Sequence, residues 1–463
     1  MADPQFRLQL ASDPRGTTTR CGLDLDTEEI RPLWDSEWEA ANPDAPISLP
    51  FAAYRDFIQW KLQMRDSFRR RGAPDHPRFA RWRQRQVNRV DGQLSAGTGP
   101  TMVHSPFCFE LSKGCSVGCA FCGVDAPKLS AIFHYTEENR RLWRDLLHVA
   151  NDIGGAATQS CFCYWATDPL DNPDYERFCI DFDELTGAFP VTTTALALKD
   201  SERTRAFLRL ASDRGCFITR FSVLSVAMMA RIHRTFTPEE LLHTECPTMN
   251  PESEMVKANA GRFRERALAD RSLLDRERKK LERKTDLLEP GRAWLATMPD
   301  APETIACVSG FLVNMVDRTV NLVSPCAATD RWPLGYMIFD ERTFTTAADF
   351  RHVVEEMIEA HMPESVDDHF VVRFRPDLRY EPTDDGFDLV AASHRVRFRN
   401  ATSPAYLRAL GDAIHGGARP AGVVALTTFY ETGVPAETTM STFDLMLSKG
   451  VLDEEPRTAR RGR

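Results

Sequence analysis

The sequence predicts an α/β protein with a helical N-terminal region, a barrel or partial barrel of parallel strands, and a small α+β module at the C-terminal end. The first observation is that apolar stripes at helical spacing alternate with short β-branched runs from about residue 106 to residue 325. Strand and helix in turn imply a parallel sheet with right-handed crossovers. The second is that alternating strands beyond residue 365 surround a turn and lead into helices.

Helices are expected over residues 1–105. The stretch PFAAYRDFIQWKLQMRDSFRRR carries apolar residues at Phe51, Tyr54, Ile58 and Leu62, which is helical spacing. The Gly-rich stretch DGQLSAGTGP then indicates a linker. This region leads into the barrel, which we assign to residues 106–340.

The barrel elements follow in order along the chain. The stripe Leu142, Leu146, Val149 predicts a helix, ATQSCFCYW a buried strand, DYERFCIDFDEL a helix, VTTTALAL a strand, SERTRAFLRLAS a helix and CFITRFSVL a strand. After a charged insertion at 260–290, expected to be a solvated surface helix, the runs TIACVSGFL and TVNLVSP predict two more strands. The chemistry of such a barrel should lie at the carboxyl ends of its strands.

Residues 365–463 are expected to form a separate, winged-helix-like domain. Two or three strands surround the hairpin signal DDG, and three short helices follow in SPAYLRALGDAIHGG, RPAGVVALTTFYETG and ETTMSTFDLMLSKGVLDEEP. A winged-helix or dimerisation module is one interpretation of this pattern, and a peptide-recognition module is the other.

Composition narrows the class of protein. The chain has 463 residues, is 42% hydrophobic and 27% charged, and has a formal net charge of -9. A nucleic-acid footprint over the whole surface is therefore not expected. No apolar run spans a bilayer and no secretion signal is recognisable, so we expect a cytoplasmic protein without a membrane partner. In a reducing compartment the 12 cysteines are better interpreted as thiols or metal ligands than as disulfides.

The stretch ELSKGCSVGCAFCGVDAP carries the most specific signal. Cys115, Cys119 and Cys122 form a Cys-X3-Cys-X2-Cys array, with Phe121 before the last thiol. A closed zinc or cluster site needs four ligands, whereas three close thiols can bind one face of a [4Fe-4S] cube and leave one iron open. The alternative is a closed site that uses Cys108 or His104 as the fourth ligand.

This array resembles that of the radical S-adenosylmethionine (SAM) superfamily. The resemblance implies a partial (β/α)6 TIM-like barrel, a [4Fe-4S] cluster, and SAM as the cofactor that binds the open iron. In that family the reduced cluster cleaves SAM to methionine and a 5'-deoxyadenosyl radical.

The resemblance also assigns residues to SAM binding. In CYWATDPLDNPDY, Asp168 and Pro169 match the Glu-Pro of a Gly-Gly-Glu-Pro-like turn, although Ala166 and Thr167 replace the glycines. Ser225 matches the ribose-binding end of the fourth strand. In CVSGFLVN a glycine would let the backbone approach adenine, with a core strand as the alternative. The full set of expected cofactor contacts is Phe121, Thr167, Asp168, Pro169, Arg220, Ser222, Ser225 and Gly310.

Cys326, in LVSPCAATDRWPLGY, is the candidate catalytic residue. It follows directly on the last expected strand, so it should face the site at the barrel mouth. A buried cysteine is most often only a small hydrophobe, but a thiol S–H is weaker than a peptide Cα–H and could donate hydrogen to a carbon radical. Cys307, on the neighbouring strand, is the reserve candidate, because alternation could point it into the barrel or toward the helices.

Five segments together resemble the proteusin-type radical SAM peptide epimerases. They are FELSKGCSVGCAFCG, CYWATDPLDNPDY, TTTALALKD, RFSVLS and SPCAATDRWPLGY. The resemblance implies inversion of L residues to D residues in a ribosomally made precursor peptide, with hydrogen returned from a cysteine thiol. It also implies a leader peptide bound by the C-terminal module and an electron donor such as flavodoxin or ferredoxin.

Two other functions remain open from the sequence. One is a different radical SAM peptide enzyme that crosslinks or dehydrogenates a residue. Because no cysteine follows Cys326, a C-terminal auxiliary-cluster extension is not expected, and thioether crosslinking is disfavoured. The other is a non-catalytic metal-bound adaptor, which would have a full set of four metal ligands.

Overall fold

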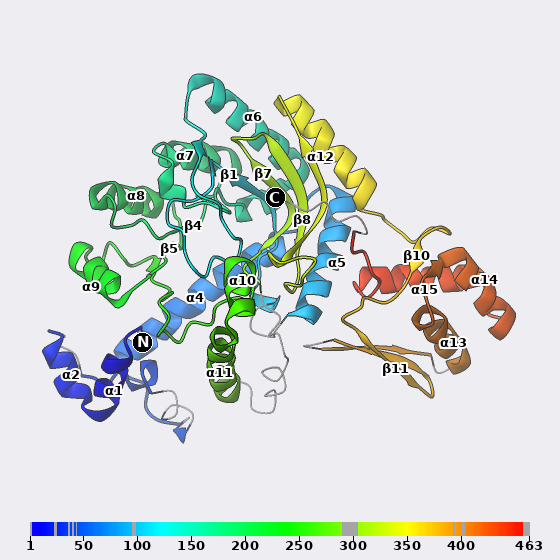
Figure 1. The fold of residues 1–463 in the computed structure, drawn as a ribbon, viewed down its shortest axis with the longest axis horizontal. Helices are drawn as coiled ribbons and strands as arrows, with labels where there is room; N and C mark the ends of the chain where they lie inside the picture. Colours follow the sequence, from blue (N-terminus) through cyan, green and yellow to red (C-terminus); the bar gives the residue numbers. More distant parts are fainter. Residues whose placement is uncertain are drawn as a thin grey trace.

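The computed structural model describes residues 2–22, 26–35, 38, 41–42, 44–94, 99–288, 304–391, 394–400 and 403–456. These residues form a mixed α/β architecture in which helices surround a central sheet, and a smaller α+β module lies beside it (Figure 1). Over the same ranges, no helix combines the length and the apolar character that crossing a bilayer requires.

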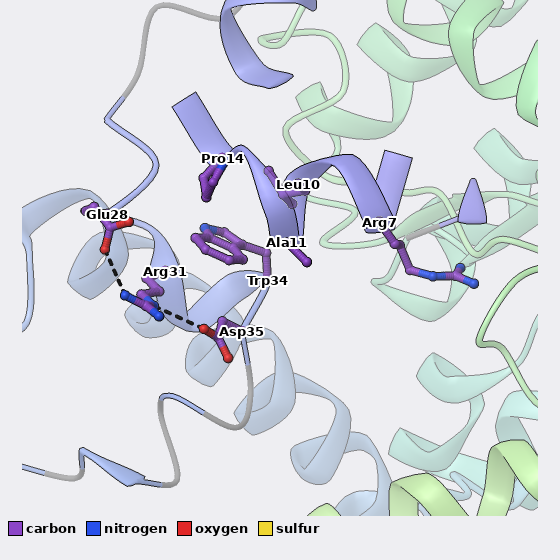
Figure 2. A pocket seen from close by; sticks show the side chains of 8 residues that line it. All are labelled: Arg7, Leu10, Ala11, Pro14, Glu28, Arg31, Trp34 and Asp35. Atoms are coloured by element: carbon purple, nitrogen blue, oxygen red, sulfur yellow. Dashed lines mark hydrogen bonds and ion pairs between the residues drawn. The ribbon is translucent and has the colours of Figure 1, made fainter. Parts of the chain in front are cut away.

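The first part of the chain is helical, as the sequence predicts. Its elements are α1 (Pro4–Ser12), α2 (Pro14–Arg20), η1 (Arg31–Leu33), α4 (Leu49–Arg71), α5 (Pro77–Gln93) and η2 (Gly99–Thr101). Helix α5 extends into the stretch expected to be a linker. Near α1 and η1 a pocket of about 260 Å³ is lined by Arg31, which pairs with Glu28 at 3.2 Å and Asp35 at 3.1 Å (Figure 2).

The central sheet has the strand order β1-β7-β8-β9. Its strands are β1 (Ser105–Glu110), β7 (Val308–Asn314), β8 (Thr319–Pro325) and β9 (Tyr336–Thr343). Strand β7 is parallel to β1, but β8 is antiparallel to β7. The prediction that β8 continues a parallel barrel is therefore wrong, because only four residues separate it from β7 and a parallel crossover needs a dozen or more.

A second sheet contains β4 (Thr192–Thr194), β5 (Thr219–Phe221) and β6 (Thr244–Glu245), all parallel. The segment at 162–164 lies between the two sheets. It forms one parallel bridge, from Cys108 to Phe162, and the Tyr164 hydroxyl donates to Thr193 Oγ1 at 2.8 Å. The expected strand at ATQSCFCYW is therefore reduced to a single bridge after the 3-10 helix η3 (Gly155–Ser160).

Helices pack against the outer face of these strands. They are α6 (Glu137–Gly154), α7 (Tyr175–Thr186), α8 (Ser201–Asp213), α9 (Val226–Thr235) and α12 (Ala347–His361). Alternation along β1 places Phe107 and Phe109 in the main core, where Phe107 stacks on Phe311 at 5.3 Å and Phe109 contacts Trp143 edge-on at 5.1 Å. The opposite face of β1 carries Cys108, which packs with Phe162 and belongs to the inner surface of the curved sheet.

Helix α4 covers the amino ends of the parallel strands. A cavity of about 250 Å³ lies there, and Lys61 of α4 pairs with Glu245 at 2.9 Å, which in turn pairs with Arg220 at 3.0 Å. The carboxyl ends of β1 and β4 lie at the other edge of the sheets.

The charged insertion forms two helices, α10 (Gly261–Ala269) and α11 (Arg271–Leu288). The prediction of a solvated surface helix is wrong for α10. Its residues Phe263 and Ala267 are buried in a cluster that also includes Leu274 and the half-buried Phe121. A helix with many charges can still bury one apolar face, and here that face covers the loop that carries the three cysteines.

The C-terminal module contains a three-stranded sheet and three helices, in the places where the sequence predicts them. Its elements are β10 (Val371–Val372), β11 (Arg379–Thr383), β12 (Gly386–Val390), β13 (Arg395–Arg399), α13 (Pro404–His415), β14 (Arg419–Pro420), α14 (Ala421–Thr432) and α15 (Ala436–Ser448). Helix α5 joins this module to the central sheet. Two residues of α5 contact the module: Arg85 binds Glu454, and the Asn88 side chain donates to the Ser448 carbonyl oxygen at 2.8 Å.

Candidate functional site

The three-cysteine array lies on one loop after the carboxyl end of β1. The short antiparallel strands β2 (Ser112–Lys113) and β3 (Ala131–Ile132) close the base of this loop. Gly114 has φ +82°, and an added Cβ there would lie 2.3 Å from the Lys128 carbonyl oxygen, so the loop turns where only glycine fits.

The three thiols are half-buried. Burial raises the pKa of Cys119 to about 11, and the adjacent thiols of Cys122 and Cys115 act in the same direction. Backbone N–H groups donate to two of the sulfur atoms, from Val117 to Cys115 at 3.4 Å and from Ala126 to Cys122 at 3.3 Å. Such bonds stabilise thiolates, which are the form that binds metals.

Within the described ranges no three His, Cys, Asp or Glu side chains are gathered closely enough to hold a single metal ion. Ligands of a four-iron cluster are spread over the corners of a cube, and three thiols spaced along one loop fit that larger group. The donor set is consequently compatible with an iron–sulfur cluster held by Cys115, Cys119 and Cys122.

The two residues named as alternative fourth ligands are engaged elsewhere. The Cys108 thiol contacts the Tyr164 carbonyl oxygen at 3.0 Å, and His104 Nδ1 hydrogen-bonds to Ser309 Oγ at 2.8 Å. His104 precedes β1, at the strand end opposite to the cysteine loop, and burial lowers its pKa well below the ordinary value. Neither side chain completes a closed site with the array.

The loop is tied to the segment that contains Asp168. Asp171 accepts hydrogen bonds from the Ser116 N–H at 2.8 Å and the Ser116 hydroxyl at 2.6 Å, directly beside Cys115. Asp171 lies in the 3-10 helix η4 (Pro169–Asp171), which Asp168 caps. The sequence assigned no role to Asp171, although it stands within the quoted segment.

Asp168 is buried, and its carboxylate accepts three hydrogen bonds from the chain itself. It accepts from the Thr194 hydroxyl and the Ala195 N–H, both at 2.7 Å, and from the Leu170 N–H at 3.1 Å. Burial raises its pKa to about 6, although these hydrogen bonds act in the opposite direction. The side chain therefore links the loop segment to β4.

Ser222, expected to contact SAM, is brought to the same place. Its N–H donates to the Thr194 carbonyl oxygen at 2.8 Å, so Ser222, Thr194 and Asp168 are neighbours at the carboxyl ends of β4 and β5. Thr167 is buried beside them, and Pro169 begins η4. The structure thus assembles the cysteine loop, the 167–169 segment and Ser222 at one edge.

The other expected contacts are placed differently. Arg220 pairs with Glu245 and lines the cavity under α4, and the exposed Ser225 caps α9 by accepting from the Met228 N–H at 3.1 Å. Phe121 packs against α10. An added Cβ at Gly310 would lie 2.0 Å from the Pro106 carbonyl oxygen, so the close approach this glycine permits is made by β1.

Glu110, the last residue of β1, is a site residue that the sequence analysis missed. It accepts from the Ala166 N–H at 2.7 Å and from the Asn314 side-chain amide at 3.1 Å, and burial raises its pKa to about 7. It therefore holds the segment before Asp168 against the ends of β1 and β7. A lone glutamate among the apolar residues of FCFELSKGC is the signal that could have identified it.

The two candidate hydrogen donors lie in different surroundings. Because β8 runs antiparallel, Cys326 follows the strand at the amino end of β7, not at the carboxyl ends of the parallel strands, and that expectation is corrected. It is buried in a cluster with Trp332 and Met337 and lines a cavity of about 270 Å³ that Arg89 and Glu454 also line. Burial raises its pKa to about 12.

Cys307 precedes β7, so it lies at the same amino end of that strand as Cys326; it packs on the inner cluster that also contacts Cys122, and on the cluster of Val90, Leu94 and Met102. Burial raises its pKa to about 12, while the charge of Arg220 acts in the opposite direction. The cysteine loop reaches this point directly, because an added Cβ on Gly123 would lie 2.9 Å from Ile305 Cγ1. Of the two thiols, Cys307 shares an environment with the cysteine array.

Comparisons with known proteins place the chain among relatives. No family model matches the sequence. The crystal structure of BtrN in complex with AdoMet and 2-DOIA aligns over 47% of this chain and 72% of that chain, with 11% identity and a TM-score of 0.29, too low to support an inference. Protein y4wI of Sinorhizobium fredii (strain NBRC 101917 / NGR234), described as uncharacterized, is 39% identical over 424 residues, which are 89% of this chain and 78% of that protein. The chain belongs to the same family as y4wI.

Proposed function

We propose that the protein is a radical SAM enzyme that epimerises residues of a ribosomally made precursor peptide. The observation that carries the proposal is the loop with Cys115, Cys119 and Cys122, which is tied through Ser116 to the 168–171 segment at the carboxyl edge of the parallel strands. Three thiols on one loop suit a cluster that keeps one iron open to a cofactor.

The chain's own residues have defined parts in this proposal. The three thiolates would hold the [4Fe-4S] cluster, and the cluster and SAM, when bound, supply a 5'-deoxyadenosyl radical. The 167–169 segment and Ser222 border the same edge and are the proposed SAM contacts, with Asp168 acting through its hydrogen bonds to β4. Arg220, Ser225, Phe121 and Gly310 have other neighbours and are weaker candidates for contact with SAM.

Inversion requires a second hydrogen donor on the face of the peptide opposite to the abstraction. A thiol can return a hydrogen atom because its S–H bond is weaker than the Cα–H bond that forms; the sulfur radical left behind would take one electron from the external electron donor and one proton from solvent. We propose Cys307 for this step, since it packs on the same cluster as Cys122, and we keep Cys326 as the comparison. Burial that raises a thiol pKa to about 12 keeps the hydrogen on sulfur, which an atom donor requires.

The C-terminal module is the proposed binding site for the leader of the precursor. In the described residues its sheet has the order β11-β12-β13, which leaves β11 and β13 as edges, and helix α13 packs on the sheet. An extended peptide can add to such an edge through main-chain hydrogen bonds. Contacts between α5 and this module, including Asn88 to Ser448, would keep the bound precursor beside the central sheet.

The test is a reaction of the reconstituted chain with its precursor, SAM and an electron donor such as flavodoxin or ferredoxin, in D2O. We expect deuterium at Cα and D residues after hydrolysis, without any change in mass for the reaction in H2O. Cys307→Ala should still produce 5'-deoxyadenosine but leave the peptide uninverted, and Cys326→Ala is the matched control.

Several outcomes would count against the proposal. Loss of two mass units would indicate dehydrogenation or crosslinking. Absence of 5'-deoxyadenosine, with a metal bound by four protein ligands, would favour an adaptor. Loss of inversion in Cys326→Ala but not in Cys307→Ala would restore the donor expected from the sequence and would refute the choice based on packing.

A further inference from the structure

Helix α10 contacts the cysteine loop from outside, through its first turn. The Arg262 guanidinium donates to the carbonyl oxygen of Cys119 at 3.0 Å, to that of Ala126 at 2.6 Å, and to Asp125 Oδ1 at 3.0 Å. These three acceptors stand at the two ends of the segment 119–126, which contains Cys122. One side chain thus fixes the distance between the ends of that segment.

Backbone contacts reinforce this arrangement. The Arg262 N–H donates to the Cys122 carbonyl oxygen at 2.9 Å, and the Gly261 N–H donates to the Pro333 carbonyl oxygen at 2.7 Å. Arg266, one turn further along, donates to the Ala120 carbonyl oxygen at 3.2 Å. The carbonyl groups of residues 119, 120, 122 and 126 therefore all accept from α10.

Gly261 allows the helix to lie this close to the loop. It has φ +55°, and an added Cβ would lie 2.5 Å from the Gly123 carbonyl oxygen and 2.6 Å from the Cys122 carbonyl oxygen. Any side chain there would push α10 away from the loop. On the buried side of the helix, Phe263 packs in the cluster that contacts Phe121, so apolar contact and hydrogen bonds act on the same segment.

We propose that the first turn of α10 is a clamp, centred on Arg262, that positions Cys119 and Cys122 to hold the iron–sulfur cluster and places a fixed positive charge beside it. The inference rests on the proposed function, because it assigns a role toward the same cluster. Groups that hydrogen-bond to metal ligands, without binding the metal themselves, commonly raise metal affinity about tenfold to a hundredfold. Arginine suits this task because its planar fork serves several acceptors at once, which a lysine ammonium on a flexible stem does not.

The first measurement uses the metal-free full-length chain. Amide hydrogen exchange reports local opening of a segment independently of global unfolding. In Arg262→Gln and in Gly261→Ala, we expect exchange over 119–126 to become at least about tenfold faster, while exchange in the core strand β7 stays as in the wild type. Arg276→Gln, which changes an exposed arginine of α11, is the matched control and should leave both regions unchanged.

The second measurement uses the reconstituted chain. Iron release to a chelator should be about tenfold to a hundredfold faster in Arg262→Gln than in the wild type or in Arg276→Gln. Arg262→Lys keeps the charge but not the fork, so it should release iron nearly as fast as Arg262→Gln. Its cluster should keep a reduction potential close to that of the wild type, whereas Arg262→Gln, having lost a positive charge, should be harder to reduce.

The two measurements separate the clamp from the proposed function. If the wild type retains no iron and sulfide, the proposed function fails, and the exchange rates still decide whether Arg262 orders the loop. If the wild type retains a cluster but Arg262→Gln matches it within about threefold, well short of the tenfold expected, in both iron release and exchange, the clamp is refuted.

Discussion

Glu110 offers a direct test of the site because its buried carboxyl makes stability depend on pH. Its pKa rises from the ordinary 4.5 to about 7, since burial disfavours the charged form, although the N–H of Ala166 and the amide of Asn314 act in the opposite direction. Each pH unit of displacement corresponds to about 1.4 kcal/mol. The fully ionised carboxylate therefore costs the folded state about 3 kcal/mol.

The sign follows from linkage. Below pH 4.5 the carboxyl is protonated in both states, and the full stability is present. As the pH rises toward 7 the unfolded chain releases this proton while the folded chain keeps it, so stability falls until the folded state also ionises. Between pH 5 and pH 8 this one group should lower the free energy of unfolding by about 2.5 kcal/mol.

Glu110→Gln removes the titrating group and keeps the shape. The amide can accept from only one of the two present donors, which costs about 1–3 kcal/mol at every pH. The difference in unfolding free energy between variant and wild type should nevertheless shift in the variant's favour by about 2.5 kcal/mol from pH 5 to pH 8. Urea unfolding of the metal-free chains, followed by circular dichroism across that range, measures it.

The control is Glu245→Gln. The pKa of Glu245 is lowered, because the hydrogen bond from Lys61 and the charge of Arg220 outweigh its burial, so it titrates below pH 5 in both states. Its difference from the wild type should be constant over the same range. If the Glu110→Gln difference also varied by less than about 0.5 kcal/mol, the assignment of a buried, protonated carboxyl at the end of β1 would be wrong.

Two further predictions concern the contact between α5 and the C-terminal module, and the reactivity of the cysteine thiols. Arg85→Met should lower the free energy of unfolding, measured in urea, by about 3–5 kcal/mol, because it leaves the nearly buried Glu454 carboxylate without its partner. Arg85 and Glu454 form hydrogen bonds of 2.9 to 3.1 Å. Adding Glu454→Gln should recover part of the loss, whereas additive effects of the two substitutions would refute the pairing. In the metal-free chain at pH 7.5, iodoacetamide should modify Cys119, whose pKa is about 11, at least about tenfold more slowly than the exposed Cys21. Mass spectrometry of the peptides follows the two rates. Equal rates would contradict the burial of the array.

Much of the fold follows from local patterns in the sequence. The stripe through Leu146 predicts α6, the run VTTTALAL contains β4, and the DDG turn joins β11 to β12. These features are short-range, because periodicity and turn residues act within a few positions of the chain. The thiol loop belongs with them, since its three cysteines stand on one short segment of the chain.

Strand direction was harder to predict, because a buried strand has the same apolar pattern whether it runs parallel or antiparallel. The signal was present in the connection, since residues 315–318 are too few for a crossover between β7 and β8. Contacts over long sequence separations were also missed. Glu110 accepts a hydrogen bond from Ala166, and Arg262 donates one to Cys119, which is more than a hundred residues away in the sequence. Neither pair lies within one local motif.

The direction of β8 changes how the two candidate thiols should be interpreted. A parallel β8 would have ended at the same edge as the cysteine loop, and Cys326 would have faced the site. The antiparallel turn instead carries Cys326 back to α5, into a cavity that Glu454 of the C-terminal segment also lines. Cys307 precedes β7 and so lies at the same open end of this hairpin, but it packs against the inner cluster with Cys122. The two thiols thus share one end of the hairpin but pack in different clusters, Cys326 with Trp332 and Cys307 with the cluster that Cys122 contacts, and the two alanine variants distinguish their roles.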